Sequence, residues 1–231
     1  VLVPFFNEER TIIDSLRELD KISISDEIIL IDDGSTDSSF KLVQNFIKDK
    51  KKYKTIQSTF NKGKGDALNQ SRGHITSEYV VIHDADLEYS PTDLIEMYKV
   101  VEKDKLVLGS RFIGTKKRNN IYLRTFLANK IMSFFFSVVH NKKITDVATC
   151  YKMMPSNYFK NNNYTEKGFS IEIEIMSKFL KHSKNIKEVP ISYNGRSYED
   201  GKKIKTTDGF QYLYNTIKYR LFEWTISGKQ I

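Results

Sequence analysis

The feature of this chain that most constrains its fold is the order of its apolar runs. Across residues 1–112, short runs rich in Val, Ile and Leu alternate with segments whose apolar residues recur every three or four positions. The first pattern is typical of strands buried on both faces, and the second of helices that pack along one stripe. Strands that alternate with helices form βαβ units with right-handed crossovers, so we expect an α/β fold with a mostly parallel central sheet flanked by helices.

The individual elements follow from these patterns. Residues 169–180 fit two of them, since Ile171, Ile173 and Ile175 alternate as in a strand whereas Ile171, Ile175 and Phe179 share one helical stripe. The helix is favoured because the three- and four-residue spacing continues. We expect strands near 1–4, 27–31, 53–58, 79–83, 106–109 and 187–191, helices over 8–21, 37–50, 65–74, 91–102 and 208–224, and a polar loop over 192–205.

Length and composition suit a single compact domain. The chain has 231 residues, and 39% hydrophobic with 13% aromatic residues are enough for a core. Its one cysteine, Cys150, excludes an intramolecular disulfide and a multi-cysteine metal site. The longest near-apolar run, 131–139, is about half of what spans a bilayer, so we expect neither a transmembrane helix nor a secretory signal. Because residue 1 already lies in a strand-like run, we also expect a few preceding residues.

The charge balance is positive: 37 Lys and Arg against 29 Asp and Glu give a net charge of +8. Nucleic acid, an anionic membrane and phosphate-bearing substrates are the usual partners of such a chain. Basic clusters at 50–54, 116–118 and 202–205 are equally typical of a solvated surface. No nucleic-acid-binding motif accompanies them, so we expect no nucleic-acid partner.

Polar side chains gather where the expected strands end. They are Asn7 and Glu8, Asp32 and Asp33, residues 61–64, Asp84 and Asp86, and Ser110 and Arg111. Ligands of open α/β sheets bind in the crevice outside the carboxyl ends of the strands. The sequence therefore predicts a binding site at this edge of the sheet.

Asp84-Ala85-Asp86 is the strongest candidate for a metal site. Two carboxylates at i and i+2 in a turn can face one divalent ion, and Glu88 offers a further oxygen. Mg²⁺ and Mn²⁺ prefer oxygen ligands and are commonly shared with phosphate groups. Taken alone, such an aspartate pair is equally typical of a turn or a helix cap.

Two further segments suggest nucleotide binding. Asp33 follows a fully apolar run, where an acid commonly accepts from a ribose hydroxyl or a base N–H, although Gly34 and Asp37 also fit a simple turn and cap. Residues 61–65 are glycine-rich with lysines before a helix start, so they offer N–H groups and charge to phosphates, or form a flexible basic turn. They match neither an ATPase P-loop nor a dinucleotide-binding fingerprint.

Taken in order, these motifs resemble those of the family 2 glycosyltransferases, which are inverting enzymes that use nucleotide-sugar donors. The motifs are Val3-Pro4-Phe5-Phe6-Asn7-Glu8, Ile31-Asp32-Asp33-Gly34-Ser35-Thr36-Asp37, Asn61-Lys62-Gly63-Lys64-Gly65-Asp66-Ala67, Asp84-Ala85-Asp86 and Gly109-Ser110-Arg111-Phe112. The resemblance is strongest to the dolichol-phosphate mannosyltransferase and polyprenyl-phosphate glycosyltransferase branch, through residues 84–91, Thr145-Asp146 before Cys150-Tyr151-Lys152, and 188–193 with Arg196 and 201–203.

The resemblance implies a GT-A fold with a nucleotide-binding half (1–112), an acceptor-side half (113–231) and Mg²⁺ or Mn²⁺ as cofactor. It implies donor binding by Pro4, Phe6, Glu8, Ile31, Asp33, Lys64, Asp84, Ala85, Asp86 and Arg111, metal binding by Asp86 and Glu88, acceptor binding by Arg124, Arg196 and Lys203, and catalytic roles for Asp86, Arg111 and Asp146. Phe6 departs from the tyrosine usual in the family, and Glu88 from the glutamine of some mannosyl enzymes.

The expected reaction is inverting transfer from a nucleotide-diphosphate sugar to a polyprenyl or dolichyl phosphate. Such a phosphate is already an anion and needs no strong general base. The alternative is a saccharide hydroxyl acceptor in surface polysaccharide assembly, for which Asp146 is the candidate base. A binding module without turnover is a further alternative, whereas a nucleic-acid binder leaves Asp33, Asp84 and Asp86 unexplained.

A basic-aromatic stretch, residues 118–140, bears on the location of the protein. Lysine and arginine interleaved with Phe and Leu on a helix suit an interfacial segment, although a core helix is the alternative. We therefore expect a cytoplasmic enzyme with reversible, peripheral membrane contact.

Overall fold

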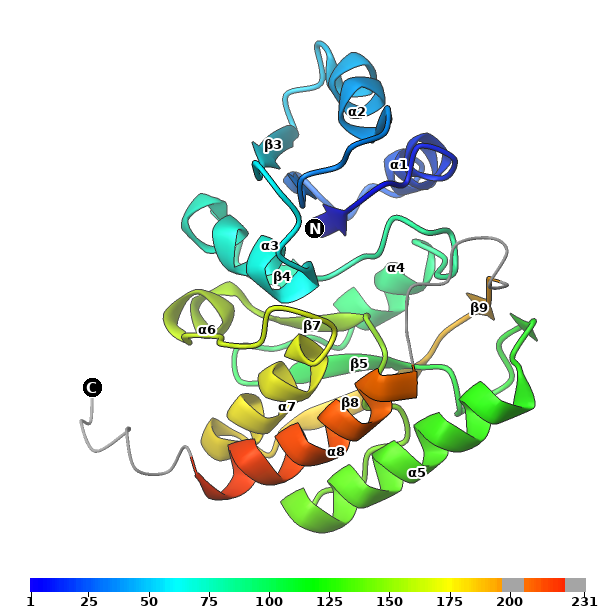
Figure 1. The fold of residues 1–231 in the computed structure, drawn as a ribbon, viewed down its shortest axis with the longest axis vertical. Coiled ribbons are helices and arrows are strands. Elements are labelled where there is room, and N and C mark those ends of the chain that lie inside the picture. Colours follow the sequence, from blue (N-terminus) through cyan, green and yellow to red (C-terminus); the bar gives the residue numbers. More distant parts are fainter. Residues whose placement is uncertain (197–205, 223–231) are drawn as a thin grey trace.

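The computed structural model of the chain describes residues 1–196 and 206–222 (Figure 1). Its first three strands, β1 (Leu2–Phe5), β2 (Ile28–Asp32) and β3 (Tyr53–Gln57), pair in parallel. On the other side of β1 lies β4 (Tyr79–Val81), joined to it by a parallel bridge between Leu2 and Ile82. The expected parallel arrangement of this half is confirmed.

The sheet continues from β4 through β7 (Lys152–Pro155) and β5 (Leu106–Ser110) to β8 (Ile186–Pro190) at the far edge. β5 and β8 are parallel, but β7 is antiparallel to both β4 and β5. Sequence analysis predicts no strand at β7, because this short segment begins with a lysine and ends with a proline. Its insertion carries residues of the second half of the chain into the middle of the sheet.

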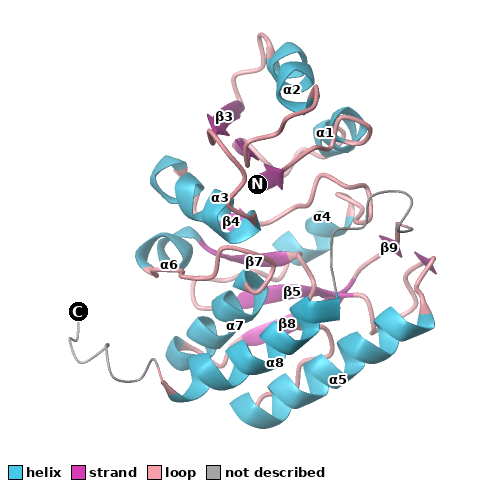
Figure 2. Ribbon diagram, viewed as in Figure 1, coloured by secondary structure: helices cyan, strands magenta, loops and turns pink. Residues whose placement is uncertain are grey.

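Helices cover both faces of the sheet (Figures 1 and 2). They are α1 (Ile12–Asp20), α2 (Ser39–Ile47), α3 (Lys64–Ser71), the 3₁₀-helix η1 (Arg72–His74), α4 (Asp93–Tyr98), α5 (Leu123–His140), α6 (Ser156–Asn161), α7 (Ile171–His182) and α8 (Thr206–Leu221). The helix favoured for 169–180 is confirmed as α7. Two short strands, β6 (Arg118–Asn119) and β9 (Tyr193–Asn194), pair with each other in a small separate sheet. β9 lies within the segment that is predicted to be a loop.

The core has two layers, one on each face. Neighbouring strand residues such as Leu2 and Val3 are both fully buried but belong to different layers. One layer contains side chains of α1, α2 and α4, and the other contains side chains of α3, α5, α6, α7 and α8. This double burial explains why the strands read as continuous apolar runs rather than alternating ones.

Candidate functional site

The loops that follow β1 and β2 are joined by hydrogen bonds. The Asn7 side-chain oxygen accepts the N–H of Thr36 at 2.8 Å, and the Asn7 N–H donates to the Ser35 hydroxyl at 3.0 Å. Asn7 adopts the left-handed conformation (φ 51°), which asparagine tolerates better than most residues. These bonds bring Glu8, Asp32 and Asp33 to one edge of the sheet, as predicted.

Asp33 organises the glycine-rich loop rather than leaving its amides open. Its carboxylate accepts from the Asn61 side chain at 2.9 Å and from the N–H groups of Lys62 at 2.9 Å and Gly63 at 2.7 Å. Burial raises the pKa of Asp33, opposed by these N–H groups. The N–H groups of Gly65 and Asp66 donate to the carbonyl of Lys167 at 2.6 and 3.2 Å. These four amides are therefore not available to a phosphate, contrary to one of the two interpretations of this loop.

Lys64 lies between two acids. Its ammonium is 2.7 Å from Asp84 Oδ1 and 2.8 Å from Glu172 Oε1, and its side chain is 9% exposed. Glu172, in the first turn of α7, also contacts Lys152 of β7. The Lys64 cation lowers the pKa of Asp84 against the opposing effect of burial. Sequence analysis predicts Lys64 and Asp84 as site residues but misses Glu172 and Lys152.

Asp86 and Glu88 have different hydrogen-bond partners although they are close in sequence. Between them Leu87 has a positive φ of 62°, and the Glu88 N–H donates to Asp86 Oδ1 at 3.0 Å. Burial and the negative charges of Asp84 and Glu88 raise the pKa of Asp86 to about 7. The carboxylate of Glu88 accepts from the Tyr193 hydroxyl at 2.8 Å and from the Arg196 N–H at 2.7 Å.

Arg196 joins the donor-side acids. Its guanidinium binds Glu8 at 3.0 and 3.3 Å and lies 3.4 Å from Asp86 Oδ2. Burial opposes, but the carboxylates of Glu8 and Asp86 outweigh it and raise the pKa of Arg196. The structure thus places this residue, predicted to bind the acceptor, beside residues predicted to bind the donor. Lys203, also predicted to bind the acceptor, lies outside the described residues.

The acids fit a divalent ion that is shared with substrate phosphate groups better than an ion that is held by protein side chains alone. Within residues 1–196 and 206–222, no group of three or more His, Cys, Asp and Glu side chains is arranged to hold a metal. Mg²⁺, however, commonly takes one or two carboxylates and completes its shell with substrate phosphate oxygens. Asp86 offers hard oxygen ligands, and the neighbouring carboxylates that disfavour its ionisation would be offset by a cation. Asp86 Oδ2, which lies 3.4 Å from the Arg196 guanidinium, therefore fits such an ion, whereas the two oxygens of Glu88 accept hydrogen bonds at 2.7 and 2.8 Å.

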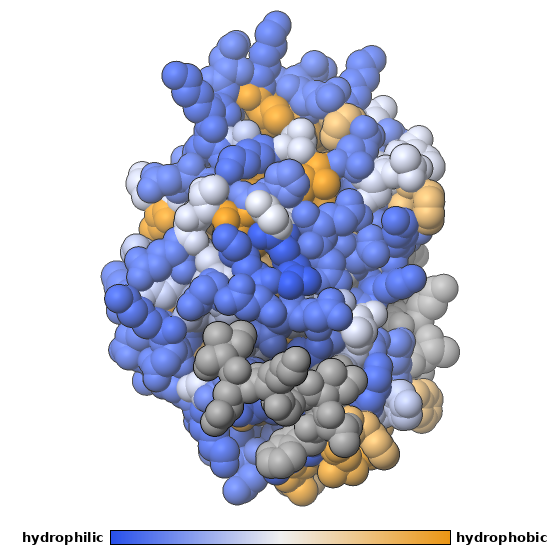
Figure 3. Space-filling view, turned by 90° about the vertical axis from the view of Figure 1, so that its left-hand side faces the viewer, coloured by the Kyte–Doolittle hydropathy of each residue, from blue (hydrophilic) through white to orange (hydrophobic). Residues whose placement is uncertain are grey.

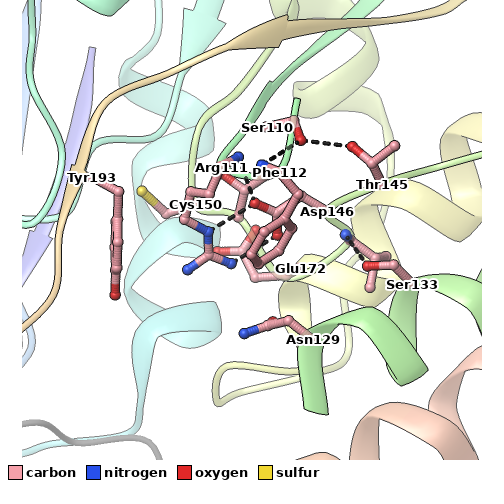
Figure 4. Close-up of polar contacts among 12 residues, drawn as sticks. Ser110, Arg111, Phe112, Asn129, Ser133, Thr145, Asp146, Cys150, Glu172 and Tyr193 are labelled. Atoms are coloured by element: carbon pink, nitrogen blue, oxygen red, sulfur yellow. Dashed lines mark hydrogen bonds and ion pairs between the residues drawn. The ribbon is translucent and has the colours of Figure 1, made fainter. Parts of the chain in front are cut away.

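Three hydrogen bonds join Arg111 and Asp146 (Figure 4). Asp146 Oδ2 accepts from the Arg111 backbone N–H at 2.9 Å and from Nε at 2.8 Å, while Oδ1 accepts from a terminal guanidinium nitrogen at 2.7 Å. Both side chains are buried, and the guanidinium lies 5.0 Å from the centre of the Tyr193 ring. Both Asp146 oxygens are thus engaged by Arg111.

A cavity of about 440 Å³ opens beside Arg111. It is lined by Arg111, Phe112, Arg118, Ile121, Leu123, Phe126 and Lys130, so cations and apolar groups share its wall. A smaller adjoining hollow includes Asn129 and Tyr193, which Figure 4 shows near Arg111. Arg124, predicted to bind the acceptor, does not line the cavity. Arg118 and Lys130, from the same basic-aromatic stretch, do.

Two helices beside the cavity expose apolar side chains. On α5 they recur at three- and four-residue spacing, and on α8 they do the same. The residues are Leu123, Leu127, Ile131, Phe134 and Val138 on α5, and Phe210, Tyr214, Ile217 and Leu221 on α8, with exposed fractions from 39% to 74%. α5 and α8 lie side by side at one end of the molecule in Figure 1, and Figure 3 shows apolar side chains gathered at that end. We call these residues the apolar face. No described helix is both long and apolar enough to cross a bilayer.

Comparison with known proteins gives three informative likenesses. The chain is 25% identical to the dolichol-phosphate mannosyltransferase of Pyrococcus furiosus, over 97% of this chain and 63% of that protein. It is 23% identical to a UDP-N-acetylglucosamine–dolichyl-phosphate N-acetylglucosaminyltransferase of Methanococcus voltae, over 96% and 95% of the two chains. The structure of Mycobacterium tuberculosis glucosyl-3-phosphoglycerate synthase with Mn²⁺, UDP and glucosyl-3-phosphoglycerate superposes with a TM-score of 0.73 at 15% identity, covering 95% of this chain and 78% of that one.

The structural likeness confirms the expected GT-A fold, with its mostly parallel sheet flanked by helices. The sequence model of one family, described as "Glycosyl transferase family 2", matches residues 1–162, which include the motifs at the ends of β1, β2, β4 and β5. With the fold and the ordered motifs in agreement, the chain belongs to glycosyl transferase family 2.

Proposed function

We propose that this chain transfers a sugar, with inversion, from a nucleotide-diphosphate sugar to a polyprenyl or dolichyl phosphate. The observation that carries the proposal is the cavity beside Arg111, which combines cations with apolar walls. A lipid phosphate is complementary to this cavity, because it carries an anion on an apolar chain. The names of the Pyrococcus and Methanococcus relatives, which refer to dolichol and dolichyl phosphate, support the same acceptor class.

The donor is assigned to the edge of the sheet formed by β1, β2 and β4. Pro4 and Ile31 are register partners on adjacent strands, so Phe6, Glu8 and Asp33 follow them at one edge. In this proposal these residues line the nucleotide, and Asp84, Ala85 and Asp86 hold the sugar diphosphate together with Arg111. Lys64 acts indirectly, since its ammonium is already between Asp84 and Glu172.

The residues of the chain lower the barrier chiefly by electrostatic means. When bound at Asp86, Mg²⁺ or Mn²⁺ supplies positive charge against the leaving diphosphate. Arg111, which Asp146 holds in one orientation, places a second cation beside the developing charge without further reorganisation. A phosphate oxygen of the acceptor forms the new bond to the anomeric carbon as the bond to the donor diphosphate breaks.

A phosphate acceptor is also consistent with the hydrogen bonds that Asp146 makes to Arg111. A hydroxyl acceptor would require a general base, and Asp146 was the candidate for that role. Both of its oxygens accept hydrogen bonds from Arg111, and a base engaged in this way is poorly placed to take a proton. This arrangement favours the lipid phosphate over a saccharide hydroxyl.

Peripheral membrane contact is part of the proposal. The apolar face on α5 and α8 adjoins the cavity, because Leu123 belongs to both. Lys130 on α5 and Arg220 on α8 add positive charge to the same two helices. Apolar side chains with flanking cations suit a helix that lies in the interface of an anionic membrane.

A transfer assay tests the proposal. UDP- and GDP-sugars that carry a radiolabelled sugar are incubated with the protein, Mn²⁺ and polyprenyl phosphate, and the products are partitioned between water and organic solvent. We expect label to enter the organic phase only when protein and polyprenyl phosphate are both present. Label that instead joins an added saccharide, with none on the lipid, would overturn the acceptor assignment.

A further inference from the structure

We propose that Glu172 is a positioning residue of the donor site, acting through Lys64 on Asp84. The inference rests on the proposed function, because Asp84 is there assigned to the donor. It concerns side chains that come from opposite halves of the chain: Asp84 and Lys64 from the first half, and Glu172 and Lys152 from the second.

The four side chains form a row of alternating charge. Asp84 contacts Lys64 at 2.7 Å, Lys64 contacts Glu172 at 2.8 Å, and Glu172 contacts Lys152 at 2.5 Å. Lys152 is fully buried, Glu172 is 2% exposed and Lys64 is 9% exposed. Buried charges of this kind depend on their partners, so a change at one end of the row alters the balance at the other.

Asp84 is the one member of the row that reaches the site. Its side chain is 23% exposed, whereas the other three are nearly inaccessible. Lys64 grips the Oδ1 atom of this carboxylate. This contact helps to orient the Asp84 carboxylate, which Cys150 also contacts.

The backbone on either side of Lys64 is packed closely against residues 166 and 167. Gly63 has a φ of 101°, and a Cβ there would lie 2.5 Å from the Lys167 carbonyl oxygen. A Cβ at Gly65 would lie 2.0 Å from the Glu166 carbonyl oxygen. Lys64 thus lies on a closely packed loop, and its ammonium is held between its two acidic partners.

Lys152 in turn fixes Glu172. Its ammonium contacts Glu172 Oε2 and donates to the carbonyl oxygens of Val147 and Thr149. Glu172 Oε1 is left to face Lys64. The antiparallel strand β7, which carries Lys152, thus connects the second half of the chain to the donor aspartate.

The test measures nucleotide affinity separately from folding. The dissociation constants of UDP and GDP, each with Mn²⁺, are determined by calorimetry for the wild type, Glu172→Gln, Lys64→Met and the double variant, and Tm is recorded for each. We expect Glu172→Gln to weaken binding of the preferred nucleotide about tenfold. If Glu172 acts through Lys64, the double variant binds no more weakly than Lys64→Met alone.

Glu27→Gln is the matched control. Glu27 is also a buried glutamate with a lysine partner, Lys54, but its other bonds go to Thr76 and Ser77, away from the row. It is expected to lower Tm and leave the nucleotide dissociation constant unchanged. If Glu172→Gln does not fold, the nucleotide dissociation constant is measured for Glu172→Asp instead, which keeps the charge and shortens the side chain.

Two results would overturn the inference. One is an unchanged dissociation constant in Glu172→Gln or Glu172→Asp, and the other is an additive loss in the double variant. A wild-type protein that binds neither UDP nor GDP would instead remove the proposed function, and the inference with it.

Discussion

The donor and acceptor ends of the site are built in different ways. At the donor end the acids are already engaged by the protein: Asp33 by the glycine-rich loop, Asp84 by Lys64, and Glu8 by Arg196. At the acceptor end, Arg111, Arg118 and Lys130 line an open cavity with apolar walls. In the proposed function, the acids of the donor site are held in place by the protein, and the cavity beside it offers cations and apolar walls to an apolar acceptor with a phosphate group.

Removal of Asp86 should break the donor end with the largest effect. Asp86→Ala deletes the carboxylate assigned to the divalent ion, and we expect metal-dependent transfer to fall by about 1,000-fold. Initial rates over a range of Mn²⁺ concentrations measure this. An Asp86→Ala enzyme that keeps full metal-dependent transfer would contradict the assigned role.

Arg111 belongs to the boundary between the two ends, and its loss should cost stability as well as activity. Arg111→Met leaves the fully buried Asp146 without its cation, so we expect the free energy of unfolding to fall by about 3–5 kcal/mol. Urea denaturation measures the change. Arg17→Met is the control, because the Arg17–Asp14 pair is exposed and should contribute less than about 0.5 kcal/mol. Equal losses in the two variants would argue against a special role for burial.

Glu27 provides a reference for a buried acid outside the site. Burial opposes ionisation, but hydrogen bonds from Lys54, Thr76 and Ser77 outweigh it and lower the pKa of Glu27 to about 2. Because this pKa is depressed, the stability it contributes is present above the ordinary value of 4.5 and is lost as the pH falls toward 2.

Glu27→Gln should therefore lower the free energy of unfolding at neutral pH by about 1.5–3 kcal/mol. The variant should also lose less stability than the wild type between pH 4.5 and pH 2. Urea denaturation across this range checks both points. Parallel pH profiles for the two proteins would show that Glu27 keeps its ordinary pKa.

Lys130 tests the acceptor end alone. Lys130→Met removes one cation from the cavity wall, and we expect KM for polyprenyl phosphate to rise about tenfold while KM for the donor stays constant. Lys143→Met, an exposed lysine beyond the end of α5, is the control. A rise in donor KM with no change for the acceptor would reverse the assignment of the two ends.

The apolar face gives the smallest expected effect. Phe134 is 72% exposed, and Phe134→Ser should weaken flotation with phosphatidylglycerol vesicles about fivefold at low salt. Phe60→Ser is the control, because Phe60 is 60% exposed but lies on a different part of the chain. Equal flotation of both variants and the wild type would place the contact elsewhere.

The sequence predicts the parallel strands, most of the helices and the edge at which polar residues meet, because these depend on local periodicity and on one rule of sheet topology. It does not predict the short helix α6, whose segment was expected to be a loop. Nor does it predict β7, whose buried Lys152 is compensated by Glu172 and by the carbonyl oxygens of Val147 and Thr149. Charge compensation of this kind joins residues far apart in the chain and leaves no local pattern.

The candidate site shows the same division. Asp33, Asp84, Asp86 and Arg111 are recognisable from motifs at strand ends. The partners that define what each one does, such as Asp146 for Arg111, follow from tertiary contacts alone. Arg196 illustrates the limit, since its guanidinium contacts the donor-side Glu8 and Asp86 although its sequence context suggested an acceptor role.

The most direct test compares polyprenyl phosphate with the corresponding polyprenol as acceptors, at saturating donor and Mn²⁺. The account predicts rapid transfer to the phosphate and no measurable transfer to the alcohol, because the cations of the cavity select an anion and Asp146, the candidate base for a hydroxyl acceptor, is engaged by Arg111. Equal or faster transfer to the alcohol would contradict it.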